Sequence, residues 1–92
     1  MLVQTKKRSG SHRGSLDVIA DILEASSGGA KKTYFMYHCN LSFKQLKYYL
    51  DLLLNKEFLC TVSDDSNPGL FRITDKGKEF LRAYRGLKAL MK

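Results

Sequence analysis

The sequence predicts a single α+β domain in which three helices precede a two-stranded hairpin and a further helix follows it. Four segments have apolar residues at three- and four-residue steps, which is the helical period. Two short extended segments are separated by dense turn chemistry, which is typical of a hairpin. A chain of 92 residues suits one modest core and leaves no room for a second domain.

Residues 1–14 are expected to form a flexible basic arm, because they are polar, contain two glycines and lack a sustained apolar period. The folded domain is expected over residues 15–92. Ser15 is a favourable N-cap for the first helix. The apolar face of this helix is predicted to contain Leu16, Ile19, Ala20 and Leu23.

Residues 31–39 are expected to form the second helix, which is short. Phe35, Met36 and Cys39 have the spacing of an inward stripe. Asn40 follows, and asparagine tolerates the left-handed conformation better than most residues do. We therefore expect a tight turn after this helix.

A third helix is predicted over residues 43–56. Ser42 and Gln45 fit a capping box, in which the serine oxygen accepts from the third helical amide and the glutamine side chain accepts from the serine amide. The inward face of the helix is predicted to contain Phe43, Leu46, Leu50 and Leu53.

Residues 58–62 and 70–73 are predicted to be the two strands of the hairpin. Thr74 is a suitable N-cap for a last helix over residues 75–92. This order of elements is that of a winged helix-turn-helix, with the hairpin as its wing. One face of the last helix carries Phe80, Tyr84, Leu87 and Met91; we expect Phe80 to serve the core and a dimer seam to begin at Tyr84.

The composition favours a polyanionic partner. Sixteen Lys and Arg against nine Asp and Glu give a net charge of +7, with the excess near the two ends of the chain.

No apolar run has the length of a membrane helix or of a secretory signal, so a soluble cytoplasmic protein is expected, associated with the nucleoid. Cys39 and Cys60 are interpreted as buried, reduced thiols. Neither a cofactor or metal motif nor a catalytic arrangement is evident, and we expect no enzyme activity.

These features predict binding of double-stranded DNA, with the third helix in the major groove. Gln45 has the donor and acceptor needed to read an adenine edge, while lysines reach guanine or phosphate. Residues at the start of the second helix, in the arm and in the second strand are expected to contact phosphates or the minor groove. The candidate DNA contacts are Arg13, Lys31, Lys32, Thr33, Ser42, Lys44, Gln45, Lys47, Tyr48 and Arg72.

Several segments resemble archaeal winged-helix proteins, a set that includes predicted transcriptional regulators and DNA-binding chromatin proteins of the ten-kilodalton class. The matching stretches are residues 15–25, 29–33, 36–37, 40–50 and 71–81, with NLSFKQLKYYL the most specific. The resemblance implies DNA binding by the third helix and a homodimer joined through the C-terminal helix. The residues expected in that interface are Tyr84, Leu87, Lys88 and Met91.

The chain departs from this family pattern at three places, one of which is a last helix with only two heptads, fewer than a long coiled coil of the chromatin type needs. Glu57 stands where such proteins usually have glycine after the third helix, so either a non-glycine residue holds a strained end or the helix ends differently. The predicted wing tip contains Asp64 and Asp65, which phosphate would repel. Three functions remain open: a transcriptional regulator, an abundant architectural chromatin protein with little sequence preference, and a winged helix used for protein–protein interaction.

Overall fold

The computed structural model describes residues 14–62 and 69–91. In this part of the chain the elements are α1 (Ser15–Ala25), α2 (Lys32–His38), α3 (Phe43–Asn55), β1 (Leu59–Val62), β2 (Leu70–Ile73) and α4 (Asp75–Leu90). The predicted α+β class and the order of elements are therefore confirmed. Residues 1–13 of the expected arm, including Arg13, and the hairpin tip with Asp64 and Asp65 lie outside the described residues.

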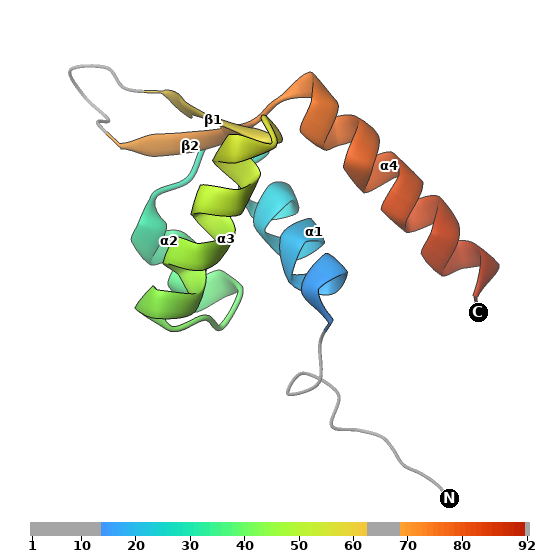
Figure 1. Ribbon diagram of the computed structural model, residues 1–92, viewed down its shortest axis with the longest axis horizontal. Coiled ribbons are helices and arrows are strands. Elements are labelled where there is room, and N and C mark those ends of the chain that lie inside the picture. The colour runs from blue at the N-terminus through green and yellow to red at the C-terminus, as the bar shows by residue number, and fades with distance from the viewer. Residues whose placement is uncertain (1–13, 63–68, 92) are drawn as a thin grey trace, which may run out of the picture.

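The first three helices enclose the core, and α4 runs along α1 on the other side of the molecule from α2 (Figure 1). Side chains from all six elements meet in this core. Its fully buried members include Ile22 and Leu23 of α1, Phe35 of α2, and Leu46 and Leu53 of α3. Leu59, Phe71, Ile73 and Leu81 close the core from the hairpin and from α4. None of the described helices is both long and apolar enough to span a membrane.

The hairpin is antiparallel, with Leu59 opposite Ile73 and Val62 opposite Leu70. The sequence predicted two strands, but the loop between α1 and α2 adds a second partner to β2. Ala30 and Phe71 exchange two backbone hydrogen bonds, of 2.9 and 2.8 Å. This pairing ties the start of α2 to the hairpin.

The start of α1 differs from the prediction. Gly14, and not Ser15, is the N-cap, and its N–H donates to the Asp17 carboxylate at 3.2 Å. Leu16, expected in the core, is 53% exposed. The helix therefore begins one residue earlier than the serine cap implied, and Val18 and Ile22 are buried on its inner face together with Ile19 and Leu23.

Two other burial predictions are wrong. Phe43, the first residue of α3, is 58% exposed and lies at the edge of a hollow, although Leu46, Leu50 and Leu53 are buried as expected. Cys60 is exposed because it alternates along β1 with the buried Leu59, while Cys39 is buried. Alternation along a short edge strand thus outweighs the usual preference of cysteine for burial.

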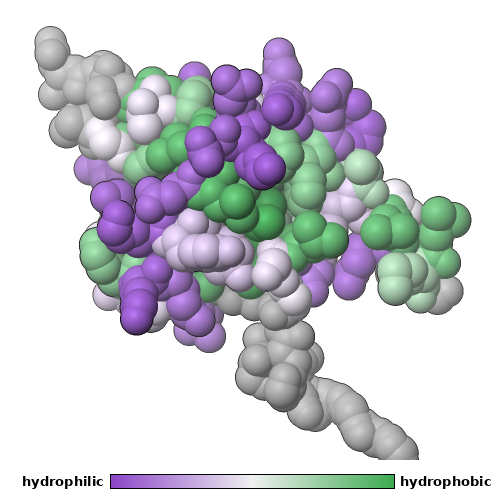
Figure 2. Space-filling view, viewed as in Figure 1, coloured by the Kyte–Doolittle hydropathy of each residue, from purple (hydrophilic) through white to green (hydrophobic). Residues whose placement is uncertain are grey.

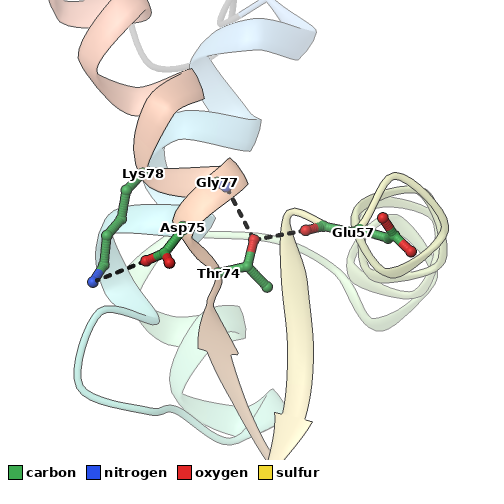
Figure 3. A network of polar contacts seen from close by, with 5 residues as sticks. All are labelled: Glu57, Thr74, Asp75, Gly77 and Lys78. Atoms are coloured by element: carbon green, nitrogen blue, oxygen red, sulfur yellow. Dashed lines mark hydrogen bonds and ion pairs between the residues drawn. The ribbon is translucent and has the colours of Figure 1, made fainter.

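The connection from α3 to α4 depends on Thr74 (Figure 3). As predicted, Thr74 caps α4: its Oγ1 accepts from the Gly77 N–H at 3.0 Å. The same hydroxyl donates to the Glu57 carbonyl oxygen at 2.6 Å. Glu57 has a φ of 67°, so a non-glycine residue does hold the left-handed end of α3. These contacts fix the positions of the hairpin and of α4 relative to α3.

Candidate nucleic-acid interface

The interface is built around the start of α3. Asn40 is left-handed, with a φ of 56°, and the Leu41 N–H donates to the Met36 carbonyl at 3.0 Å, which closes the turn after α2. Ser42 then caps α3 as predicted. Its N–H donates to Gln45 Oε1 at 3.0 Å, and the Gln45 N–H donates to Ser42 Oγ at 3.1 Å. The first turn of α3 is therefore held in one geometry before any partner arrives.

The predicted contact residues of α3 are all exposed. Lys44, Gln45, Lys47 and Tyr48 lie outside the buried face that contains Leu46 and Leu50. Figure 2 shows hydrophilic side chains spread over the face of the molecule that carries α3. Because a helix fits within a major groove about 12 Å wide, an exposed polar helix face of this kind is sterically suited to enter it.

Two of these side chains already have partners within the chain. Lys47 Nζ lies 3.6 Å from an Asp51 carboxylate oxygen, one turn along the helix. Such an exposed pair contributes about 0.3–0.5 kcal/mol, so a phosphate would compete readily for the ammonium group. Gln45 Oε1 serves the cap, and its Nε2 group is the part of the side chain outside the cap hydrogen bonds. Bidentate pairing with adenine therefore requires this oxygen to be shared with Ser42 or released from it.

Residues of α2 join this face. Lys31 is the N-cap of α2, Lys32 and Thr33 form its first turn, and all three are exposed. Lys32 and Lys47 line the same hollow of about 170 Å³, which also contains Phe43. The fold thus brings cationic side chains from two helices to one surface, as expected from the sequence.

Arg72 is more separate from these residues. It is exposed on β2, opposite Cys60, and its neighbours Phe71 and Ile73 point into the core. Arg13, the remaining predicted contact, lies outside the described residues. The described part of the interface therefore consists of α3, the start of α2 and one arginine on the hairpin.

Exposed aromatic rings accompany the cations, and most of them were not predicted from the sequence. Phe43 was assigned to the core, while Tyr34 and Tyr37 were given no role. Tyr37 is 89% exposed because it lies on the side of α2 opposite the buried Phe35. A helical projection centred on Phe35 would have found it, since residues two positions apart point about 200° apart around a helix.

Comparison with known proteins decides the family. A family model described as "Winged helix-turn-helix" matches residues 12–92. The chain belongs to this family. The expected resemblance is thereby confirmed, and β1 and β2 form the wing of a winged helix.

Among solved structures, this winged helix is similar to Sso10a-2, described as a DNA-binding protein from Sulfolobus solfataricus. The TM-score is 0.76 and the sequence identity is 22%, and the match covers 86% of this chain and 82% of that chain. At this identity the likeness establishes a shared fold. A search among curated proteins finds no match.

The surface of α4 that was expected to form a dimer seam is partly used within the chain. The Tyr84 hydroxyl donates to the Asp17 carboxylate, and Lys88 Nζ lies 3.7 Å from the same group. Arg85 also pairs with Glu24 of α1. Leu87 and Met91 remain exposed, together with Leu90. Figure 2 shows apolar side chains gathered at the C-terminal end of α4.

Proposed function

We propose that this winged helix binds double-stranded DNA with α3 in the major groove and acts, without catalysing a reaction, as a transcriptional regulator associated with the nucleoid. The observation that carries the proposal is the shared cationic surface of α2 and α3, where Lys32 and Lys47 line one hollow beside the capped start of α3. The net charge of +7 and the printed description of Sso10a-2 support it further.

The contacts are proposed to have two roles. Lys31, Lys32 and Thr33 would hold phosphates and so set the position of the domain on the duplex, and Arg72 would reach the backbone from the hairpin. Arg13, in the basic arm, would enter the minor groove. The other contacts lie at the start of α3, where Lys44 and Lys47 reach guanine or phosphate and Gln45 is the best placed to read sequence through its Nε2 group. Ser42, Lys44, Gln45, Lys47 and Tyr48 form this second group.

A salt titration with a labelled duplex tests the placement of α3. The logarithm of the binding constant should fall linearly with the logarithm of salt concentration, at about 0.9 for each phosphate neutralised. In the double variant Lys44→Ala/Lys47→Ala, affinity should fall for every duplex and the slope should decrease by up to about 2 if both lysines neutralise phosphates.

The matched control is Lys76→Ala/Lys78→Ala, which removes the same charge from exposed positions at the start of α4. This control variant should keep most of the affinity for the duplex and most of the slope of the logarithm of the binding constant against the logarithm of salt concentration. Equal losses in the two double variants would mean that net charge alone attracts DNA, and the placement of α3 would then be wrong.

Selection of bound fragments from random duplexes distinguishes a regulator from an architectural chromatin protein. A regulator recovers a motif, and Gln45→Ala should alter its preferred base at one position. Recovery of all sequences with equal efficiency would instead indicate an architectural protein that recognises the backbone.

We further propose that the domain forms a homodimer through α4. Leu87, Leu90 and Met91 are exposed on its last turns. Leu16 of α1 lines an apolar hollow together with Tyr84 and Leu87. Tyr84 and Lys88 would border this seam while keeping their contacts with Asp17. Burial of this surface would add to the modest core of a short chain.

Sedimentation of Leu87→Lys tests the dimer, because a charge at the centre of the seam costs more than one at its rim. The variant is expected to sediment as a monomer at concentrations at which the unaltered chain is a dimer. Gly86→Lys is the control, since it adds the same charge one residue away on the helix where a side chain meets open space. A dimer that persists in Leu87→Lys would contradict the proposed seam.

A further inference from the structure

The outward face of α2 carries aromatic rings that the core does not use. Tyr37 is 89% exposed and Tyr34 is 48% exposed. Tyr34 also stacks on the ring of His38, with centroids 5.2 Å apart and planes only 12° from parallel. A seven-residue helix thus presents three rings to solvent, while Phe35 on its opposite side is buried.

The charged residues nearest to these rings in the sequence are lysines. Between Glu24 and Asp51 the sequence contains no Asp or Glu, and its four lysines are Lys31, Lys32, Lys44 and Lys47. Four of the five tyrosines of the chain are in this same stretch: Tyr34, Tyr37, Tyr48 and Tyr49. A surface that combines exposed tyrosines with lysines is complementary to nucleobases joined by phosphates, because the bases stack on the rings while the cations neutralise the backbone.

A hollow beside Tyr37 provides room for such a base. It has a volume of about 360 Å³ and is lined by Tyr37, Met36, Thr33, Asn40 and Leu41. Met36 and Leu41 supply apolar surface, and the Asn40 side-chain amide has both a donor and an acceptor for a base edge. An aromatic ring, an apolar floor and an amide at the rim are the groups that a single unstacked base requires.

We propose that the outward face of α2 binds single-stranded nucleic acid, with an unpaired base stacked on Tyr37 and neighbouring phosphates held by Lys31 and Lys32. This site goes beyond the duplex binding proposed for α3. In a duplex the faces of the bases are covered by their neighbours, so stacking on an outward ring requires a strand that is already unpaired. The lining of the hollow beside Tyr37 contains no acidic side chain, which favours a polyanion over a protein partner.

Binding of a labelled oligothymidylate to the full chain, at low and at moderate salt, tests the proposal. Tyr37→Ala should weaken this binding about tenfold, in line with the loss of one base–aromatic contact. Tyr37→Phe should keep it, because the ring remains. Thr61→Ala is the control for truncation of an exposed side chain outside the proposed sites and should have no effect. Because Tyr37 lies outside the core, the unfolding temperatures of both Tyr37 variants should equal that of the unaltered chain.

Photocrosslinking locates the site directly. An oligonucleotide with 5-iodouracil in place of thymine attaches to aromatic rings on which the base stacks. Trypsin cleaves after Lys32, Lys44 and Lys47, which separates residues 33–44, with Tyr34 and Tyr37, from residues 48–56, with Tyr48 and Tyr49. The crosslink is expected on residues 33–44. A crosslink confined to residues 48–56 would overturn the proposal.

The two proposals fail in different ways. If Tyr37→Ala weakens binding of duplex and single strand equally, α2 belongs to the duplex interface and the separate site does not exist. If the oligothymidylate does not bind, or binds to Tyr37→Ala as tightly as to the unaltered chain, the single-strand site is likewise rejected. If Lys44→Ala/Lys47→Ala leaves duplex binding unchanged while Tyr37→Ala lowers only single-strand binding, the proposal for α3 fails and the one for α2 stands.

Discussion

The Thr74 hydroxyl joins two helices by donating to the Glu57 carbonyl oxygen at 2.6 Å while accepting from the Gly77 N–H at 3.0 Å (Figure 3). Glu57 ends α3 and Thr74 caps α4, so one side chain connects residues that are 17 positions apart. The hairpin of β1 and β2 lies between these two residues in the sequence, so both of its ends are close to this hydrogen bond. The position of the wing relative to α3 therefore depends on a hydrogen bond outside the proposed DNA contacts.

Thr74→Val should destabilise the domain by about 1–2 kcal/mol, because valine keeps the shape of threonine but removes both the cap and the bond to Glu57. Chemical denaturation followed by circular dichroism measures this loss. Thr61→Val is the control: Thr61 is exposed on β1, where valine suits a strand at least as well. Equal stability of the two variants would show that the Thr74 hydroxyl contributes nothing.

Glu57→Gly should stabilise the domain by about 0.5–1 kcal/mol. A left-handed conformation costs a residue with a Cβ atom about 1–2 kcal/mol, and the greater freedom of glycine in the unfolded chain offsets part of this gain. Glu57 has a φ of 67°, whereas its neighbour Lys56 has a φ of −81°. Lys56→Gly should therefore destabilise the domain under the same conditions. Destabilisation by both substitutions would contradict the conformational argument.

Two glycines of α4 should respond to alanine with opposite signs. A Cβ atom on Gly77 would collide with the Phe58 carbonyl oxygen and lie 2.7 Å from Ile73 Cγ1, so α4 could no longer approach the hairpin as closely. Gly77→Ala should cost about 1–3 kcal/mol or more. A Cβ atom on Gly86 meets open space, and Gly86→Ala should stabilise the domain by about 0.5–1 kcal/mol through helix propensity. Thermal unfolding of both variants measures the two effects.

Local signals predicted the elements well because each depends on a few neighbouring residues. The capping box of Ser42 and Gln45 and the cap at Thr74 were both found from spacing alone. The start of α1 was misplaced because Asp17 supports a cap at Gly14 through its own carboxylate, and this arrangement competes with a serine cap one residue later. The pairing of Ala30 with β2 depends on tertiary contact and leaves no periodic signal in a loop.

The candidate interface was predicted less completely, because the exposure of some of its residues also depends on tertiary contacts. Exposure of the lysines on α3 follows from helical geometry, since Leu46 and Leu50 define the buried side. Exposure of Phe43 does not, because an apolar residue at the end of a helix is buried only if a neighbouring element extends far enough to cover it. The contacts of Tyr84 with Asp17 likewise required the packing of α4 on α1.

The hydrogen bond between Tyr84 and Asp17 should make stability depend on pH at both ends of the scale. Because the ionised carboxylate accepts the Tyr84 hydroxyl, the pKa of Asp17 is lowered from 3.8 and that of Tyr84 is raised from 10.0 to about 12. The contribution of Asp17 is present above pH 3.8 and is lost as the pH falls through its lowered pKa. The contribution of Tyr84 is present below pH 10.0 and is lost as the pH rises toward 12.

Tyr84→Phe removes the hydroxyl and keeps the ring, so its stability should be lower than that of the unaltered chain mainly between pH 3.8 and pH 10.0, with the difference shrinking on either side. Urea denaturation across this range measures the difference, since urea leaves the ionic strength unchanged. Some acid dependence should persist in the variant, because Lys88 still lies 3.7 Å from Asp17. Tyr48→Phe on α3 is the control for loss of a tyrosine hydroxyl elsewhere. A difference between Tyr84→Phe and the unaltered chain that stays constant from pH 10.0 to pH 12 would show that Tyr84 does not donate to Asp17 in solution.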